Sequence, residues 1–193
     1  MLGRATLVVA FAAFVGGCNL KLGDSKSEQV ATAKMEEFVS QEGKFKAKFP
    51  GKPDTQRQTI DVPARGKTFQ LKLLMYSTMA SNSGYTVGVA EAPLPGLIDP
   101  IETRILLEKG RDGAMEAVGG TVDSSKSILL QGRYQGLEIT GRTAPPKGPS
   151  DGVFRGRIYL VEKRLYQAYA VGTGTFTTDA RTNEFFESFQ AFE

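Results

Sequence analysis

The strongest constraint on the fold is a series of short runs in which apolar and polar residues alternate. Phe45, Ala47 and Phe49 alternate with lysines, and residues 50–53 (Pro-Gly-Lys-Pro) end that run. The ranges 68–76 and 85–89 repeat the period of two. Such a period places one side of a strand on a core and leaves the other side polar. The last two ranges therefore predict adjacent strands of an antiparallel sheet.

The second half of the chain contains further strand signals. Four segments fit strands: 121–131, 133–143, 153–161 and 165–171. The polar residues 162–164 separate the last two segments by the short distance typical of a hairpin. Residues 144–151 contain three prolines and a glycine, which predicts an irregular, exposed loop.

Residues 99–120 carry the signals of one long helix. Asp99 is a suitable N-cap, Pro100 fits the first helical position, and Glu102 has the spacing of a capping box. Apolar residues recur at helical spacing within it, and Gly119-Gly120 ends it. The internal glycines at 110 and 113 either let the helix lie close on a sheet or break it into two pieces.

A second, shorter helix is expected at the end of the chain. It carries Phe185, Phe186 and Phe189, and Thr177 or Thr178 can cap it. The sum of these elements is an α+β fold: an antiparallel β-sheet flanked by helices.

Composition excludes several classes of function. The 193 residues contain no histidine and one cysteine, so Ser-His and Cys-His nucleophile pairs, histidine metal sites and intramolecular disulfides are excluded. The net charge of +3, from 24 basic and 21 acidic residues, is not typical of nucleic-acid binding. The sequence has no Walker-type glycine loop, and we expect no cofactor and no metal.

The N-terminal segment resembles a lipoprotein signal peptide. A short cationic start, an apolar run and Val15-Gly16-Gly17 precede Cys18, and this sequence resembles a bacterial lipobox. The resemblance implies cleavage before Cys18 and attachment of lipid to its thiol. We therefore expect a signal peptide over 1–17, a lipidated N-terminus and polar, flexible tether over 18–34, and a single α+β domain over 35–193.

Three segments carry a resemblance to a known family. Residues 42–53, 157–167 and 185–189 resemble uncharacterised secreted domains of planctomycete-type bacteria, and more distantly the chain is similar to PsbP-like domains. This resemblance implies an αβα sandwich around an antiparallel sheet. Better-known members of the superfamily bind or help assemble other proteins. No functional residue of the family matches a position in this chain.

The hairpin formed by 153–161 and 165–171 holds the candidate binding residues. They are cations and phenol rings on one side of the hairpin and at its turn: Arg155, Arg157, Tyr159, Lys163, Arg164 and Tyr166. Cations beside phenol rings can recognise carboxylates, phosphates or sugars. The same pattern also fits a solvated sheet face or a protected edge strand.

These patterns favour a lipid-anchored module of the cell envelope, facing the periplasm or exterior, that binds a protein or an envelope polymer without catalysis. Its expected contacts are the membrane, through the lipid on Cys18, and that partner, but not nucleic acid. One alternative is a histidine-free hydrolase that uses carboxylates such as Glu91, Glu138 or Glu162. The other is a structural spacer without a specific ligand.

Overall fold

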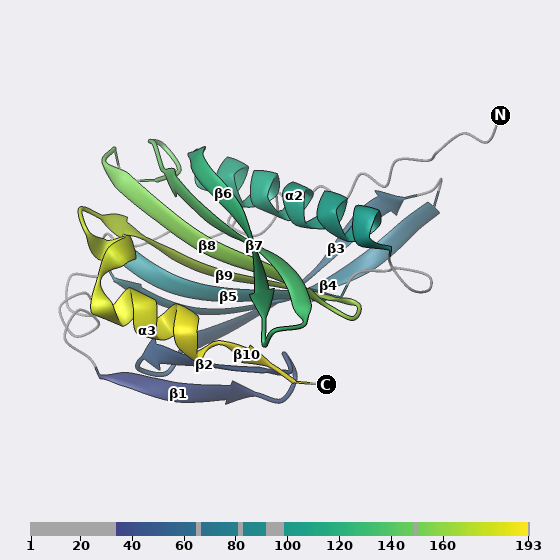
Figure 1. Ribbon diagram of the computed structural model, residues 1–193, viewed down its shortest axis with the longest axis horizontal. Helices are drawn as coiled ribbons and strands as arrows, with labels where there is room; N and C mark the ends of the chain where they lie inside the picture. Colours follow the sequence, from purple (N-terminus) through teal and green to yellow (C-terminus); the bar gives the residue numbers. More distant parts are fainter. Residues whose placement is uncertain (1–33, 65–66, 81–82, 92–98, 149, 193) are drawn as a thin grey trace.

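The computed structural model describes residues 34–64, 67–80, 83–91, 99–148 and 150–192. The expected signal peptide, Cys18 and nearly all of the expected tether lie outside these residues. The described strands form a seven-stranded and a three-stranded sheet, and every strand pair in both is antiparallel. The α+β class expected from the sequence is confirmed (Figure 1).

The seven-stranded sheet has the order β3-β4-β5-β9-β8-β7-β6. In that order, its strands are β3 (Asp54–Ala64), β4 (Lys67–Ala80), β5 (Ser83–Glu91), β9 (Arg164–Thr173), β8 (Gly152–Val161), β7 (Tyr134–Arg142) and β6 (Thr121–Leu130). The predicted strands at 68–76 and 85–89 are adjacent, as expected, and pair as β4 with β5. The predicted hairpin is formed by β8 and β9.

One helix covers one face of this sheet. α2 (Pro100–Ala117) starts as the sequence predicts: Asp99 Oδ1 accepts a 2.7 Å hydrogen bond from the amide of Glu102. The helix is unbroken at Gly110, which lies against β8 and β9. A Cβ at Gly110 would come within 3.2 Å of Gln167 Nε2, so glycine allows the close approach of helix and sheet. Leu106, Leu107 and Met115 then pack in the core on this face.

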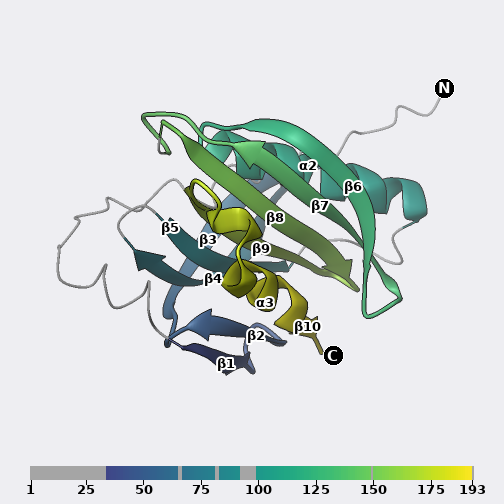
Figure 2. The same ribbon diagram turned by 60° about the vertical axis from the view of Figure 1, so that its left-hand side comes forward.

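The other face is covered by a second layer of mixed structure. It contains the 3₁₀ helix η2 (Phe176–Thr178), the helix α3 (Ala180–Ser188) and the small sheet of β1 (Met35–Ser40), β2 (Phe45–Pro50) and β10 (Gln190–Ala191). Figure 2 shows α3 in front of the large sheet, followed by β10 at the small sheet. Phe45, Phe49, Phe185 and Phe189 belong to the core on this side. The sandwich therefore has a helix on one face and a helix with a small sheet on the other.

The strand β1, the 3₁₀ helix η2 and three further features of this fold were not predicted from the sequence. β3 is polar and exposed over residues 54–59, so its sequence shows no alternation of apolar and polar residues. It forms a strand because it pairs with β4 along its whole length. β10 has two residues and exists through its pairing with β2. The predicted cap of the last helix was wrong: Asp179, rather than Thr177 or Thr178, accepts a 2.6 Å hydrogen bond from the amide of Thr182, because both threonines lie in η2.

No helix in the described ranges is long and apolar enough to cross a membrane.

Replacement of Asp179 tests the corrected cap. We expect Asp179→Ala to lower the free energy of unfolding by about 1 kcal/mol, because the Thr182 amide loses its acceptor. The control is Thr178→Ala, which removes only an exposed hydrogen bond to the carbonyl of Thr175 and should cost less than about 0.5 kcal/mol. Urea unfolding followed by circular dichroism measures both. A larger loss in Thr178→Ala than in Asp179→Ala would contradict the assignment.

Candidate functional site

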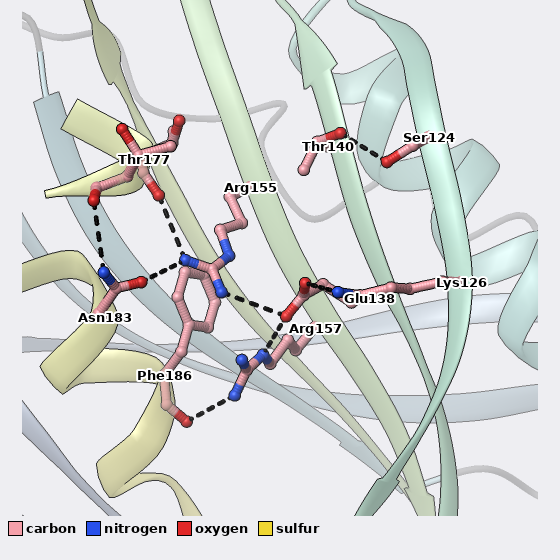
Figure 3. Close-up of polar contacts among 10 residues, drawn as sticks. Ser124, Lys126, Glu138, Thr140, Arg155, Arg157, Thr177, Asn183 and Phe186 are labelled. Carbon is pink, nitrogen blue, oxygen red and sulfur yellow. Dashed lines mark hydrogen bonds and ion pairs between the residues drawn. The ribbon is translucent and has the colours of Figure 1, made fainter. Parts of the chain in front are cut away.

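Four charged side chains meet on the α3 side of the large sheet, and we call them the Glu138 cluster: Lys126, Glu138, Arg155 and Arg157. Antiparallel pairing places Lys126 of β6 opposite Glu138 of β7, and Glu138 opposite Arg157 of β8. Residues directly opposite each other project to the same face. Arg155 projects to this face as well, two positions along β8. Figure 3 shows the three cations directed at the carboxylate.

The carboxylate of Glu138 is at the centre of the cluster. Its Oε2 accepts hydrogen bonds from Arg157 Nε at 2.6 Å and from Arg155 Nη2 at 3.3 Å, and its Oε1 lies 2.8 Å from Lys126 Nζ. The side chains of Glu138, Arg155 and Arg157 are 8%, 15% and 21% exposed, whereas that of Lys126 is 67% exposed. The cluster is therefore buried at the arginines and open to solvent at the lysine.

The two arginines also hold α3 against the sheet. Arg155 Nη1 donates to Asn183 Oδ1 at 2.6 Å, and Arg157 Nη1 donates to the carbonyl of Phe186 at 3.2 Å (Figure 3). Their guanidinium carbons lie 4.8 Å and 5.3 Å from the centroid of the Phe186 ring. Cation–π contacts of this kind strengthen when they are shielded from water. The arginines thus have a structural role.

The surroundings of Glu138 determine its protonation. Burial raises the pKa of this carboxyl, but the hydrogen bonds from Lys126 and Arg157 and the charges of Arg157 and Arg155 together lower it to about 2. Glu138 is therefore ionised near neutral pH and cannot act there as a general acid. Its single negative charge faces three positive charges, so the four side chains together carry a net charge of +2.

The structure divides the predicted binding residues into three groups. Arg155 and Arg157 join the Glu138 cluster. Tyr159 and Tyr166 face each other across the β8–β9 hairpin and are buried, with the Tyr159 ring stacked on Phe189 at 5.7 Å between centroids. Burial raises the pKa of both phenols. These rings belong to the core and offer no surface to a ligand.

The remaining two predicted residues lie at the hairpin turn. Lys163 is exposed in the turn, and Arg164 begins β9. Arg157 and Lys163 are six positions apart, and β8 ends between them at Val161, so Lys163 lies beyond the end of the strand that carries Arg157. The turn therefore does not contribute to the Glu138 cluster. The predicted lipidation site, Cys18, lies outside the described residues.

Sequence reasoning missed the partners of the arginines. Glu138 was considered only as a catalytic carboxylate, and neither Asn183 nor Phe186 was linked to the hairpin. A usable signal did exist for one pair: Lys126 and Glu138 each lie six positions from Gly132, in the turn between β6 and β7. Centring the predicted hairpin on that glycine places the two side chains opposite each other. No comparable signal connects α3 with β8.

An open groove of about 590 Å³ lies on α3, next to β1 and β2. Four of the charged residues in its lining form two pairs: Lys46 Nζ lies 3.3 Å from Glu37 Oε2, and Lys48 Nζ lies 2.7 Å from Glu184 Oε1. Asn183 lines this groove and also binds Arg155, so α3 separates the groove from the Glu138 cluster. Across the described ranges, no group of three or more histidine, cysteine or acidic residues is placed to hold a metal ion.

Comparison with known proteins identifies the fold. No protein-family model matches the chain, and no curated protein has a matching sequence. Among solved structures, the chain is similar to cyanobacterial PsbP (CyanoP) from Synechocystis sp. PCC 6803, with a TM-score of 0.51 and 10% identity over 83% of this chain and 94% of that chain. A Pseudomonas aeruginosa protein of unknown function matches with a TM-score of 0.37 and 11% identity, covering 78% of this chain and 91% of that chain. The first match confirms a distant PsbP-like fold.

The paired state of Glu138 predicts a loss of stability in acid. The folded pKa of about 2 lies below the ordinary value of 4.5, so the stabilisation is complete above about pH 4.5 and is lost as the pH falls toward 2. It amounts to about 3 kcal/mol of the free energy of unfolding. We expect Glu138→Gln to be less stable than the wild type near neutrality and to approach it toward pH 2. Urea unfolding across this range measures the difference.

The matched control is Glu42→Gln, at an exposed carboxylate that binds Arg57. This variant should keep nearly the same acid dependence as the wild type, because an exposed pair contributes little. An acid dependence in Glu138→Gln equal to that of the wild type would show that the cluster does not stabilise the fold.

Proposed function

We propose that this chain is a lipid-anchored, non-catalytic protein of the cell envelope that binds a protein or an envelope polymer. The observation that carries this proposal is the state of Glu138, the one carboxylate of the Glu138 cluster. Three cations hold it in the ionised form, and two of them, Arg155 and Arg157, join α3 to the sheet. A carboxylate that stays ionised and paired with cations is suited to binding and to a structural role, but not to proton transfer.

The hydrolase alternative requires different electrostatics. A carboxylate-dependent glycosidase needs one carboxyl group with a raised pKa, which donates a proton, and a second carboxylate across the scissile bond. The pKa of Glu138 is lowered instead. Glu162, also considered from the sequence, lies in the exposed turn between β8 and β9, where nothing shields it from water. These surroundings favour the binding role over the catalytic one.

The N-terminal sequence supports attachment to a membrane. Val15-Gly16-Gly17-Cys18 resembles a lipobox, and 16 positions separate Cys18 from Lys34, the first described residue. A chain of that length spans at most about 55 Å when fully extended. An acylated Cys18 would therefore keep the folded part within that distance of the bilayer surface. The resemblance to planctomycete-type secreted domains agrees with such a location.

The mass of the mature protein tests the anchor. We expect wild-type protein from the membrane fraction to have a mass that starts at Cys18 and includes acyl chains, because lipid is attached to that thiol before cleavage. Cys18→Ala should lack both the acyl mass and the cleavage before residue 18. Intact-mass spectrometry after detergent extraction measures both proteins. Wild-type protein of unmodified mass in the soluble fraction would overturn the proposal.

Activity assays on the same extracted protein test its non-catalytic nature. We expect co-purifying envelope proteins or polymers to remain chemically unchanged during incubation, because no proton donor is poised at the Glu138 cluster. Chromatography of the incubated material measures turnover. Turnover that a single carboxylate substitution abolishes would establish the hydrolase alternative.

A further inference from the structure

We propose that the Glu138 cluster binds an oxyanion, a phosphate or carboxylate group of the ligand, on its solvent-exposed side between Lys126 and Arg157. This inference rests on the proposed binding function and specifies the chemistry of the ligand.

The first argument is the charge balance. In the described part of the chain, the ion pairs of Lys126, Arg155 and Arg157 all end on the one carboxylate of Glu138. Two acids near the cluster along the chain are engaged elsewhere: Glu184 pairs with Lys48, and Asp123 with Arg142. Two positive charges are therefore uncompensated beside two arginines that are mostly shielded from solvent. A bound anion relieves the mutual repulsion of these cations.

The second argument is the exposed position of Lys126. Arg155 and Arg157 already neutralise Glu138 and fix α3 through Asn183 and Phe186. Lys126 binds the other carboxylate oxygen from an edge strand, with a side chain that is 67% exposed. The pair helps to keep the buried Glu138 ionised, but its lysine end is exposed. The ammonium group of Lys126 is therefore placed where a ligand in solvent can reach it.

The third argument is the supply of hydrogen-bond donors. The ammonium of Lys126 has three N–H groups, and its contact with one oxygen of Glu138 uses one of them. The guanidinium of Arg157 has five, of which two bind Glu138 and Phe186 and one interacts with the hydroxyl of the buried Tyr159. Ser124 and Thr140 are the next pair along β6 and β7 on the same face, and their exposed hydroxyl oxygens lie 2.7 Å apart (Figure 3). Cationic and hydroxyl donors grouped in this way suit phosphate and carboxylate oxygens.

The experiment uses the lipidated full-length protein in a non-ionic detergent at low salt. Inorganic phosphate and acetate are titrated separately, with nuclear magnetic resonance of backbone amides as the readout. We expect saturable shifts of β6 and β7 signals with at least one of the two probes. In Lys126→Ala the affinity should fall about tenfold, as expected for loss of a charge-assisted hydrogen bond. The control Lys163→Ala removes an exposed lysine at the distant turn and should bind as the wild type does.

Two results would overturn the inference: no saturable shift with either probe, or equal affinities of Lys126→Ala and the wild type. If phosphate binds, phosphatidylglycerol added to the micelles and soluble polyphosphate distinguish a lipid headgroup from a polymer as its source. The mass of the anchored protein and the turnover assay do not depend on these titrations. If the anion does not bind but the mass and turnover results are as expected, the proposed function is retained and only the oxyanion ligand is rejected.

Discussion

Burial of both faces of the seven-stranded sheet is the constraint on which the rest of this structure depends. The central strand β9 has six consecutive buried residues, so neither of its faces can remain in water. A single helix, α2, covers one face with aliphatic side chains. The other face is covered by α3 together with β1, β2 and β10, through a core rich in aromatic rings. The small sheet therefore completes a layer that α3 alone is too short to provide.

The Glu138 cluster lies where this second layer ends. Phe186 of α3 packs against the arginines of β8, and the sheet continues to β7 and β6. On this face, Ile128, Leu130 and Tyr134 near the β6–β7 turn still join the aromatic core, whereas Ser124, Lys126, Glu138 and Thr140 are polar. Arg155 and Arg157 are at the boundary, with the ring of Phe186 on one side and Glu138 on the other. A guanidinium suits this place because its flat face packs on an aromatic ring while its edge donates hydrogen bonds. The boundary is thus a structural contact, and it holds Glu138, the only charged residue among the described ones that is buried.

Binding and catalysis make opposite demands on such a carboxylate. A catalytic acid needs a pKa near the working pH, which burial without cations provides, whereas Glu138 is buried together with three cations and is ionised. Here the carboxylate orients the arginines and leaves an excess of positive charge toward solvent at Lys126. This arrangement favours recognition of negatively charged groups, and attachment through Cys18 would present it close to a membrane surface.

Several elements could be predicted from the sequence because their signals are local. Alternation over 45–49 and 85–89 identified strands, and Asp99 with Pro100 identified the start of α2, because capping and strand periodicity depend on residues only a few positions apart. Three other features could not be predicted in this way: Tyr159 is buried, the polar β3 is a strand, and Arg155 lies under α3. Those outcomes depend on which distant segment covers each face of the sheet. Residues 155 and 183 have no local relation along the chain, so packing of the second layer alone brings them together.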